Sequence, residues 1–201
     1  MKIRQPKILV IDNYDSFTYN LIQMLEEHAG CSFDVVRNDR LPFQSMDTYQ
    51  KILISPGPGL PSNIDLVCKL IKKYAGSRSI LGVCLGHQAI AEVYGGSLFN
   101  LTTVSHGTRK LIHISEPLEY LFKGVPEYFD AGLYHSWVVN KDTMPDCLRI
   151  TAVSDDGLVM ALAHHQYDVR GIQFHPESIM TGVGKTIIAN WIEHENHGEL
   201  R

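Results

Sequence analysis

The amino-acid sequence predicts an α/β fold: a three-layer sandwich around a mostly parallel central sheet with antiparallel additions. In the first half of the chain, short apolar runs alternate with segments of helical apolar spacing, which is typical of parallel strands joined by helices. Between residues 97 and 174 short strand-like runs dominate, which predicts antiparallel strands at one end of the sheet. No repeat, low-complexity segment or linker interrupts the 201 residues, so we expect one domain over residues 1–201.

The individual elements are expected where apolar runs and capping residues mark them. Strands of the first half are expected at residues 7–11, 33–37, 51–55 and 79–83. Ser16 is expected to cap a helix whose apolar face runs from Phe17 to Ala29 and which ends at Gly30, and Ser62 to cap a second helix. Later strands are expected at residues 110–114, 134–139, 148–153, 158–163 and 171–174, and a last helix at residues 185–194.

Residues 82–88 (GVCLGHQ) are the most informative stretch of the chain. They join an apolar strand-like run to a helix-like one, which puts Cys84 on a tight strand-to-helix turn. A thiol there meets the positive end of the helix dipole and unpaired backbone N–H groups, which favour the thiolate. The flanking glycines allow the turn and the approach of a substrate. A buried structural cysteine would not need this setting, so Cys84 is interpreted as a nucleophile.

A nucleophile needs a base, and the base needs an orienting partner. His175 follows the strand-like run at residues 171–174, and Glu177 lies two residues further on. In extended chain residues two apart point to the same side, so Glu177 can hold one ring nitrogen of His175 while the other faces the thiol. We therefore expect a Cys84–His175–Glu177 triad. Alone, His-Pro-Glu would favour a surface turn; with Cys84 present the functional interpretation is preferred.

Together, six motifs in order resemble the class I, triad-type, glutamine amidotransferases. They are residues 12–21 (DNYDSFTYNL), 37–39 (RND), 55–59 (SPGPG), 82–88 (GVCLGHQ), 134–136 (YHS) and 173–178 (QFHPES). More narrowly, the chain is similar to the small subunits of anthranilate synthase and of aminodeoxychorismate synthase. The resemblance covers nearly the whole chain and implies a flavodoxin-like version of the predicted sandwich.

The resemblance also implies roles for further residues. Backbone N–H groups of Gly57 and Leu85 would form the oxyanion hole, and a wider set would bind glutamine: Gly57, Pro58, Gly59, Leu85, Gln88, Ser136 and Trp137. Trp137 stands where the family usually has an aliphatic residue, and Leu133 where it has arginine. Contact and signalling with a partner subunit would involve Asn13, Tyr14, Ser16, His106 and Gly107.

Composition argues against several other classes of protein. The net charge of −4 without a basic cluster argues against a nucleic-acid partner. The longest apolar runs are only a handful of residues, so we expect no membrane span. No apolar signal core precedes the first expected strand, and we therefore expect a cytoplasmic protein. The four cysteines show no metal-binding or paired spacing, so we expect free thiols, no metal site and no cofactor in this chain. The resemblance implies that the partner subunit needs Mg²⁺.

The expected function is hydrolysis of L-glutamine and delivery of ammonia to the chorismate-binding large subunit of anthranilate synthase, in tryptophan biosynthesis. The nearest alternative is the same role in aminodeoxychorismate synthase, in folate biosynthesis, or in both. A stand-alone γ-glutamyl hydrolase is disfavoured by the small size and missing secretion signal. A non-enzymatic regulatory module is disfavoured because all three triad residues are present.

Overall fold

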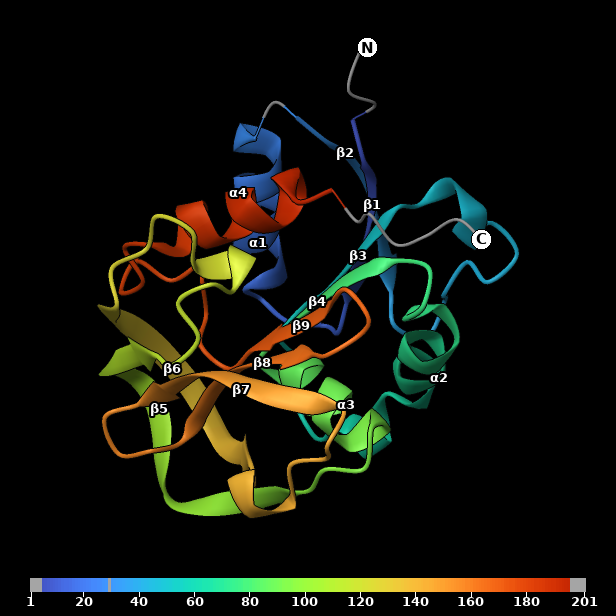
Figure 1. Ribbon diagram of the computed structural model, residues 1–201. Helices are drawn as coiled ribbons and strands as arrows, with labels where there is room; N and C mark the ends of the chain where they lie inside the picture. The colour runs from blue at the N-terminus through green and yellow to red at the C-terminus, as the bar shows by residue number, and fades with distance from the viewer. Residues whose placement is uncertain (1–4, 29, 196–201) are drawn as a thin grey trace.

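The structure, a computed structural model, describes residues 5–28 and 30–195. Nine strands form one sheet in the order β2-β1-β3-β4-β9-β8-β7-β5-β6 (Figure 1). The pairs from β2 to β9 are parallel and the pairs from β9 to β6 are antiparallel. The predicted parallel sheet with antiparallel additions at one end is confirmed. No helix in the described residues is long and apolar enough to cross a membrane.

The elements alternate in the first half of the chain and become mostly strands in the second. The strands are β1 (Lys7–Asp12), β2 (Ser32–Arg37), β3 (Lys51–Ile54), β4 (Ser79–Val83), β5 (Leu98–Ile114), β6 (Tyr128–Val139), β7 (Leu148–Ser154), β8 (Val159–His164) and β9 (Val169–Ile172). The α-helices are α1 (Thr18–Glu27), α2 (Asp65–Tyr74), α3 (Leu85–Val93) and α4 (Gly184–Glu193).

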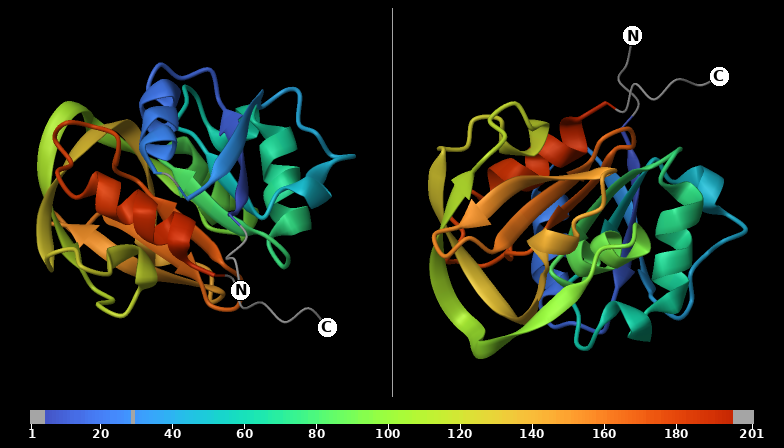
Figure 2. Two further views of the ribbon diagram at one scale, coloured as in Figure 1. Left: turned by 90° about the horizontal axis from the view of Figure 1, so that it is seen from above. Right: turned by 60° about the horizontal axis from the view of Figure 1, so that its bottom comes forward.

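Helices α1 and α4 cover one face of the sheet and α2 and α3 cover the other, which makes three layers (Figures 1 and 2). Side chains of a strand alternate between the faces, so Ile8 and Val10 of β1 pack with α1 and α4, whereas Leu9 and Ile11 pack with α2 and α3. Both faces of the central strands are therefore buried, which explains why these strands are continuous apolar runs.

Both predicted serine caps are wrong. Ser16 is exposed, and the turn before α1 is closed instead by Asp12, whose Oδ1 accepts from the backbone N–H of Tyr14 at 2.9 Å and from the Thr18 hydroxyl at 3.0 Å. Before α2, a short 3₁₀ turn over Pro61–Asn63 takes the place of a Ser62 cap, and the Asn63 side chain accepts from the Leu60 N–H. In both turns the oxygen of an aspartate or asparagine side chain, and not the serine hydroxyl, accepts from the free backbone N–H groups.

The ends of several elements also differ from prediction. Helix α1 ends at Glu27, so Gly30 is not its terminator; Ala29 lies outside the described residues. Strand β9 is Val169–Ile172, two residues earlier than expected. Strands β5 and β6 are much longer than their apolar cores predict, because they pair with each other over most of their length through two register shifts.

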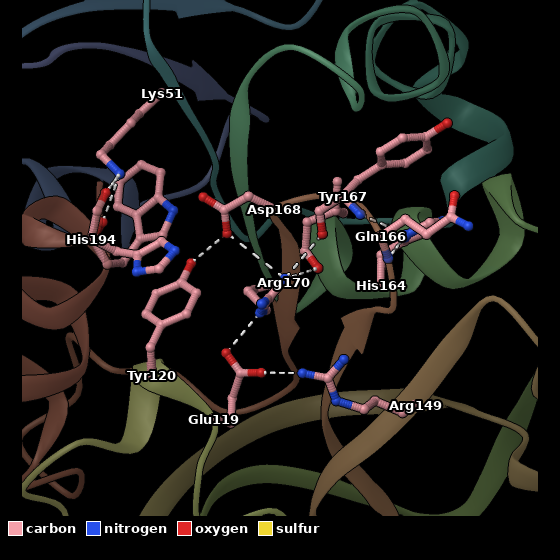
Figure 3. Close-up of polar contacts among 12 residues, drawn as sticks. Lys51, Glu119, Tyr120, Arg149, His164, Gln166, Tyr167, Asp168, Arg170 and His194 are labelled. Carbon is pink, nitrogen blue, oxygen red and sulfur yellow. Dashed lines mark hydrogen bonds and ion pairs between the residues drawn. The ribbon is translucent and has the colours of Figure 1, made fainter. Parts of the chain in front are cut away.

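A buried charged cluster closes the amino ends of the parallel strands (Figure 3). Glu119 accepts from Arg170 at 2.7 Å and from Arg149 at 2.9 Å, and Asp168 accepts from the Tyr120 hydroxyl at 2.8 Å. The Lys51 ammonium, at the start of β3, donates to the carbonyls of Trp191 and His194 at the end of α4. This cluster ties α4 to the sheet, at the edge opposite Cys84.

Candidate active site

The predicted triad residues meet at the carboxyl edge of the sheet. β4 ends at Val83 immediately before Cys84, and β9 ends at Ile172 three residues before His175. These two strands are parallel neighbours, so their carboxyl ends deliver both side chains to one place. The backbone N–H of Cys84 donates to the Ile172 carbonyl at 2.8 Å, which fixes the turn against β9.

Cys84 has an unusual backbone, with φ 52° and ψ −100°, immediately before the first residue of α3. L-residues rarely adopt this conformation, and such strain is typically retained at functional sites. The turn is possible because two glycines remove side chains that would collide with backbone. A Cβ on Gly82 would lie 2.5 Å from the Gly86 carbonyl oxygen, and one on Gly86 would lie 2.8 Å from the Ile54 carbonyl oxygen. Cys84 is buried, with 7% of the residue exposed.

His175 and Glu177 form the expected pair. Nδ1 of His175 lies 2.6 Å from Oε1 of Glu177, and the Glu177 side chain has no exposed surface. Burial alone would lower the pKa of His175, but the Cys84 side chain and the Glu177 carboxylate outweigh it and raise that pKa to about 10. Nε2 of His175 is buried and has no hydrogen-bond partner among the described residues, which leaves it available to Cys84.

The position of the His175 ring is set by contacts that the sequence did not reveal. Phe17 and Tyr134 pack edge-on against it, with ring centroids 5.2 and 4.9 Å away. The backbone N–H of His175 donates to the Gly132 carbonyl of β6 at 3.1 Å, and the Thr181 hydroxyl donates to the His175 carbonyl at 2.7 Å. The far end of the sheet, β6, therefore curls back to support the residue that follows β9.

The loop after β3 lies beside the nucleophile, as the alternation of strands predicts. Gly57 is so close to Leu85 and Asn13 that a Cβ there would lie 2.9 Å from Leu85 Cδ2 and 2.5 Å from Asn13 Cβ. Leu85 is the first residue of α3, where backbone N–H groups lack partners within the helix. The two predicted oxyanion-hole residues are therefore adjacent. Pro58 and Gly59 are exposed on the same loop, and Gly59 has φ 87°.

Gln88 and Trp137 are joined directly. Nε2 of Gln88 donates to the Trp137 carbonyl of β6 at 2.8 Å, and also to Oε1 of Gln173 at 3.1 Å. Both of these hydrogen bonds use the amide nitrogen of Gln88. The expected contact between Gln88 and the substrate glutamine would therefore be made by the side-chain oxygen of Gln88. Ser136 and Trp137 are half-buried. Gln173, which sequence reasoning did not single out, is fully buried and places its own Nε2 3.5 Å from the Cys84 sulfur.

The residues expected at a partner interface divide into two groups. Tyr14 and Ser16 are exposed, whereas Asn13 is 2% exposed and holds the loop after β3 by donating to the Ser55 carbonyl at 2.8 Å. Gly107 is exposed at a bulge with φ 66°, where a Cβ would lie 3.9 Å from the Tyr134 ring. The backbone of His106 pairs with Tyr134 in the β5–β6 ladder, but its side chain lies outside what the structure describes.

Two further histidines lie near the triad and are buried. His135 and His87 have no hydrogen-bond partner on either ring nitrogen within the described part of the chain. Burial lowers the pKa of His135 to about 4 and that of His87 to about 3, so both rings are neutral at pH 7. Among the described residues, no group of three or more His, Cys, Asp or Glu side chains is placed to hold a metal ion.

The fold is an α/β sandwich in which a cysteine, a histidine and a glutamate side chain gather at the carboxyl edge of the parallel strands. The chain belongs to the class-I glutamine amidotransferase family, whose model matches residues 9–194. It is 45% identical over 192 residues to an anthranilate synthase beta subunit from Oryza sativa, covering 92% of this chain and 70% of that protein. It is 42% identical over 188 residues to the aminodeoxychorismate/anthranilate synthase component 2 of Bacillus subtilis, covering 92% of this chain and 95% of that one.

The fold is also found in a crystal structure of a glutamine amidotransferase from Thermotoga maritima. The TM-score is 0.79 over 96% of this chain and 100% of that chain, at 13% sequence identity. At this identity the likeness concerns the fold alone, and it agrees with the predicted flavodoxin-like sandwich.

Proposed function

We propose that this chain is the glutaminase subunit of a chorismate-using synthase and that Cys84, His175 and Glu177 perform the hydrolysis. The observation that carries the proposal is that the strained Cys84 turn lies at the same edge of the sheet as the buried pair of His175 and Glu177. In that pair, Nδ1 of His175 lies 2.6 Å from Oε1 of Glu177. Membership of the class-I glutamine amidotransferase family supports the choice of glutamine as substrate. The similarity to component 2 of aminodeoxychorismate/anthranilate synthase supports the choice of a chorismate-using partner.

Acylation begins with transfer of the Cys84 thiol proton to Nε2 of His175. The thiolate then attacks the side-chain carbonyl carbon of glutamine, and the negative oxygen is stabilised by the N–H groups of Gly57 and Leu85. His175 gives its proton to the amide nitrogen, the C–N bond breaks, and ammonia leaves a glutamyl thioester. Glu177 holds Nδ1 of His175 and stabilises the imidazolium, which agrees with the raised pKa of His175.

Deacylation uses the same groups in the opposite order. His175 takes a proton from water as the water oxygen attacks the thioester carbonyl. The C–S bond then breaks, glutamate leaves, and the proton returns to the Cys84 sulfur. No redox step or metal is needed for this hydrolysis, so we propose that the chain itself uses no cofactor and that any Mg²⁺ requirement belongs to the partner.

Glutamine specificity is assigned to the residues around the nucleophile. The exposed Pro58 and Gly59 form one wall of the proposed pocket, and Ser136 and Trp137 of β6 form the other, with main-chain groups holding the α-amino and α-carboxylate ends. Gln88 links the second wall to α3, the helix that follows Cys84, through its 2.8 Å hydrogen bond to the Trp137 carbonyl.

A partner subunit is required by the chemistry of the product. Ammonia released into neutral water is mostly protonated and then is no longer a nucleophile, so a closed path to the second active site prevents the loss. A groove of about 540 Å³ opens beside the triad, between α1 and the loop that leads to α4, and includes Phe17, Tyr134 and Glu177 in its lining. We place the partner over this edge, near the exposed Tyr14, Ser16 and Gly107.

Anthranilate synthase is the proposed complex, and aminodeoxychorismate synthase, or a subunit shared by both, is the alternative. The two names occur among relatives of nearly equal identity, 45% and 42%, so identity alone does not separate the pathways. We also propose a cytoplasmic location, which would keep the thiol of Cys84 reduced; the four cysteines are free in the structure.

The test is reconstitution of the complex with the organism's candidate large subunit, chorismate and glutamine. Fluorescent anthranilate should form with the wild-type chain and not with Cys84→Ser. Added ammonium salts should restore anthranilate formation with Cys84→Ser, because the partner performs that chemistry. Glutamate release without anthranilate would favour the folate alternative, and no glutamate release with either candidate partner would overturn the proposal.

A further inference from the structure

Gln173 occupies a position that the proposed mechanism does not use. It follows the last residue of β9 and precedes Phe174 and His175, and its backbone N–H donates to the Met160 carbonyl at 2.8 Å. Its side chain has no exposed surface. A fully buried amide must find partners for both its donor and its acceptor, so its contacts identify what it is built to hold.

The contacts of Gln173 form a chain that starts at the wall of the proposed glutamine pocket. The Trp137 carbonyl accepts from Nε2 of Gln88 at 2.8 Å, and the same Nε2 lies 3.1 Å from Oε1 of Gln173. At the other end, Nε2 of Gln173 lies 3.5 Å from the sulfur of Cys84. Residues of β6 and α3 and the residue that follows β9 thus form one chain of contacts that ends at the Cys84 sulfur.

The orientation of both amides follows from the first link. A backbone carbonyl can only accept, so the Gln88 atom facing Trp137 must be the amino nitrogen. That nitrogen also faces Gln173, so the Gln173 atom opposite it must be the carbonyl oxygen. The remaining Gln173 atom, its NH₂ group, is therefore the one directed at Cys84. An N–H donor is suited to a thiolate, because the negative sulfur is the better acceptor.

We infer that Gln173 is a catalytic residue of this site, whose amide N–H donates to the Cys84 sulfur, stabilises the thiolate and aims it at the substrate. Gln88 and the Trp137 carbonyl are positioning groups that act through it. The inference rests on the proposed function, because it assigns a new residue to the same thiolate. The same contacts connect Trp137, in the wall proposed to hold the α-amino and α-carboxylate groups of glutamine, to the Cys84 sulfur. A displacement of Trp137 is therefore transmitted to Cys84 through the side-chain amides of Gln88 and Gln173.

The donor can be removed while the volume is kept. Gln173→Met has nearly the same length and no N–H, and Gln173→Glu keeps an oxygen near Gln88 but places no amide donor at the sulfur. Gln88→Met removes the group that orients Gln173. Gln166→Met is the matched control, since the same substitution is made at an exposed glutamine at the opposite edge of the sheet.

The primary measurement is alkylation of Cys84 by iodoacetamide in the full chain without glutamine, followed by mass spectrometry of peptides. The half-buried Cys31 and Cys147 serve as internal controls in the same sample. Loss of a hydrogen bond to a charged group predicts an alkylation rate at pH 7 that is about 10- to 100-fold lower in Gln173→Met, and a pH profile displaced to higher pH. Gln88→Met should lose about 2- to 10-fold, as expected for a neutral hydrogen bond.

Turnover provides the second readout, in the complex with the synthase subunit. The kcat for glutamate release should fall with Gln173→Met by about the same factor as the alkylation rate, while KM changes far less. Alkylation and kcat within twofold of wild type would overturn the inference. If circular dichroism shows that Gln173→Met does not fold, Gln173→Glu and Gln88→Met decide the matter by the same criterion.

Different results would overturn the proposed function and the role of Gln173. Glutamate release by Cys84→Ser would overturn the proposed function itself. Inactive Cys84→Ser together with wild-type behaviour of Gln173→Met would overturn only the role of Gln173. Wild-type behaviour of Gln166→Met is required in either case, since it shows that the substitution alone has no effect.

Discussion

Gly82→Ala tests whether the geometry of the cysteine turn is required for activity. Gly82 lies in β4 between Ile54 of β3 and Gly171 of β9, so the strand has no room to move sideways. An added Cβ would lie 2.5 Å from the Gly86 carbonyl oxygen and 2.8 Å from the backbone nitrogen of His87. Both atoms are backbone, so the first turn of α3 must move rather than a side chain.

The size of the effect follows from that overlap. Ordinary contact with a Cβ begins at 3.4 Å, so the first turn of α3 must retreat by about 0.9 Å. Overpacking of this kind costs about 1–3 kcal/mol, which for a chain of this size lowers Tm by about 3–10 °C. A displacement of about 1 Å at the reacting groups costs about 100-fold in rate, and this turn carries Leu85 and Gln88.

The assay is glutamate release by the complex, together with thermal unfolding of the free chain. Gly76→Ala is the control, because Gly76 is exposed after α2 and its added Cβ meets nothing nearer than 3.6 Å. Synthesis from ammonium salts should stay at the wild-type level in both variants. A Gly82→Ala chain with wild-type Tm and wild-type glutaminase activity would refute the argument that these glycines shape the nucleophile turn.

Four further predictions concern the triad. Cys84→Gly should unfold a few degrees above Cys84→Ala, because both lose the thiol but only glycine relieves the strained φ of 52°; equal Tm values would show that the turn is not strained. In Cys84→Ala the pKa of His175, followed by NMR, should fall from about 10, because Cys84 is the largest influence opposing burial; an unchanged value would contradict this. Because the folded state raises the pKa of His175, protonated His175 stabilises the folded chain. This stabilisation is complete below the ordinary pKa of 6.5 and is lost as the pH rises toward 10. The wild type should therefore lose stability relative to Cys84→Ala between these two pH values. Glu177→Gln should reduce glutaminase kcat less than His175→Ala, since the orienting residue contributes less than the base; equal losses would contradict that order.

Much of this structure follows from local sequence patterns. The parallel strands are continuous apolar runs because both of their faces are buried. Cys84 follows β4 directly, and His175 lies three residues after the end of β9. Their meeting at one edge was therefore predictable from the alternation of strand and helix. The structure brings the triad residues together, and their catalytic roles stay predictions until tested.

The features that were missed depend on distant partners. Strand β5 extends over Leu98–Ile114 although much of that stretch is polar, because pairing with β6 rather than burial defines it. The turn before α1 is closed by Asp12, and competition between two nearby oxygens for one N–H cannot be judged from residue type alone. Gln173 gave no periodic signal, since a single buried amide acquires its meaning only when Gln88 and Cys84 are placed around it.

The most direct test of the central claim is detection of the covalent intermediate. The complex, turning over glutamine with chorismate present, should be quenched in acid and its peptides measured by mass spectrometry. A glutamyl thioester on the peptide that contains Cys84, absent without glutamine and absent in Cys84→Ser, is the predicted result. Steady glutamate release with no adduct on Cys84, and equal release by Cys84→Ser, would contradict the account.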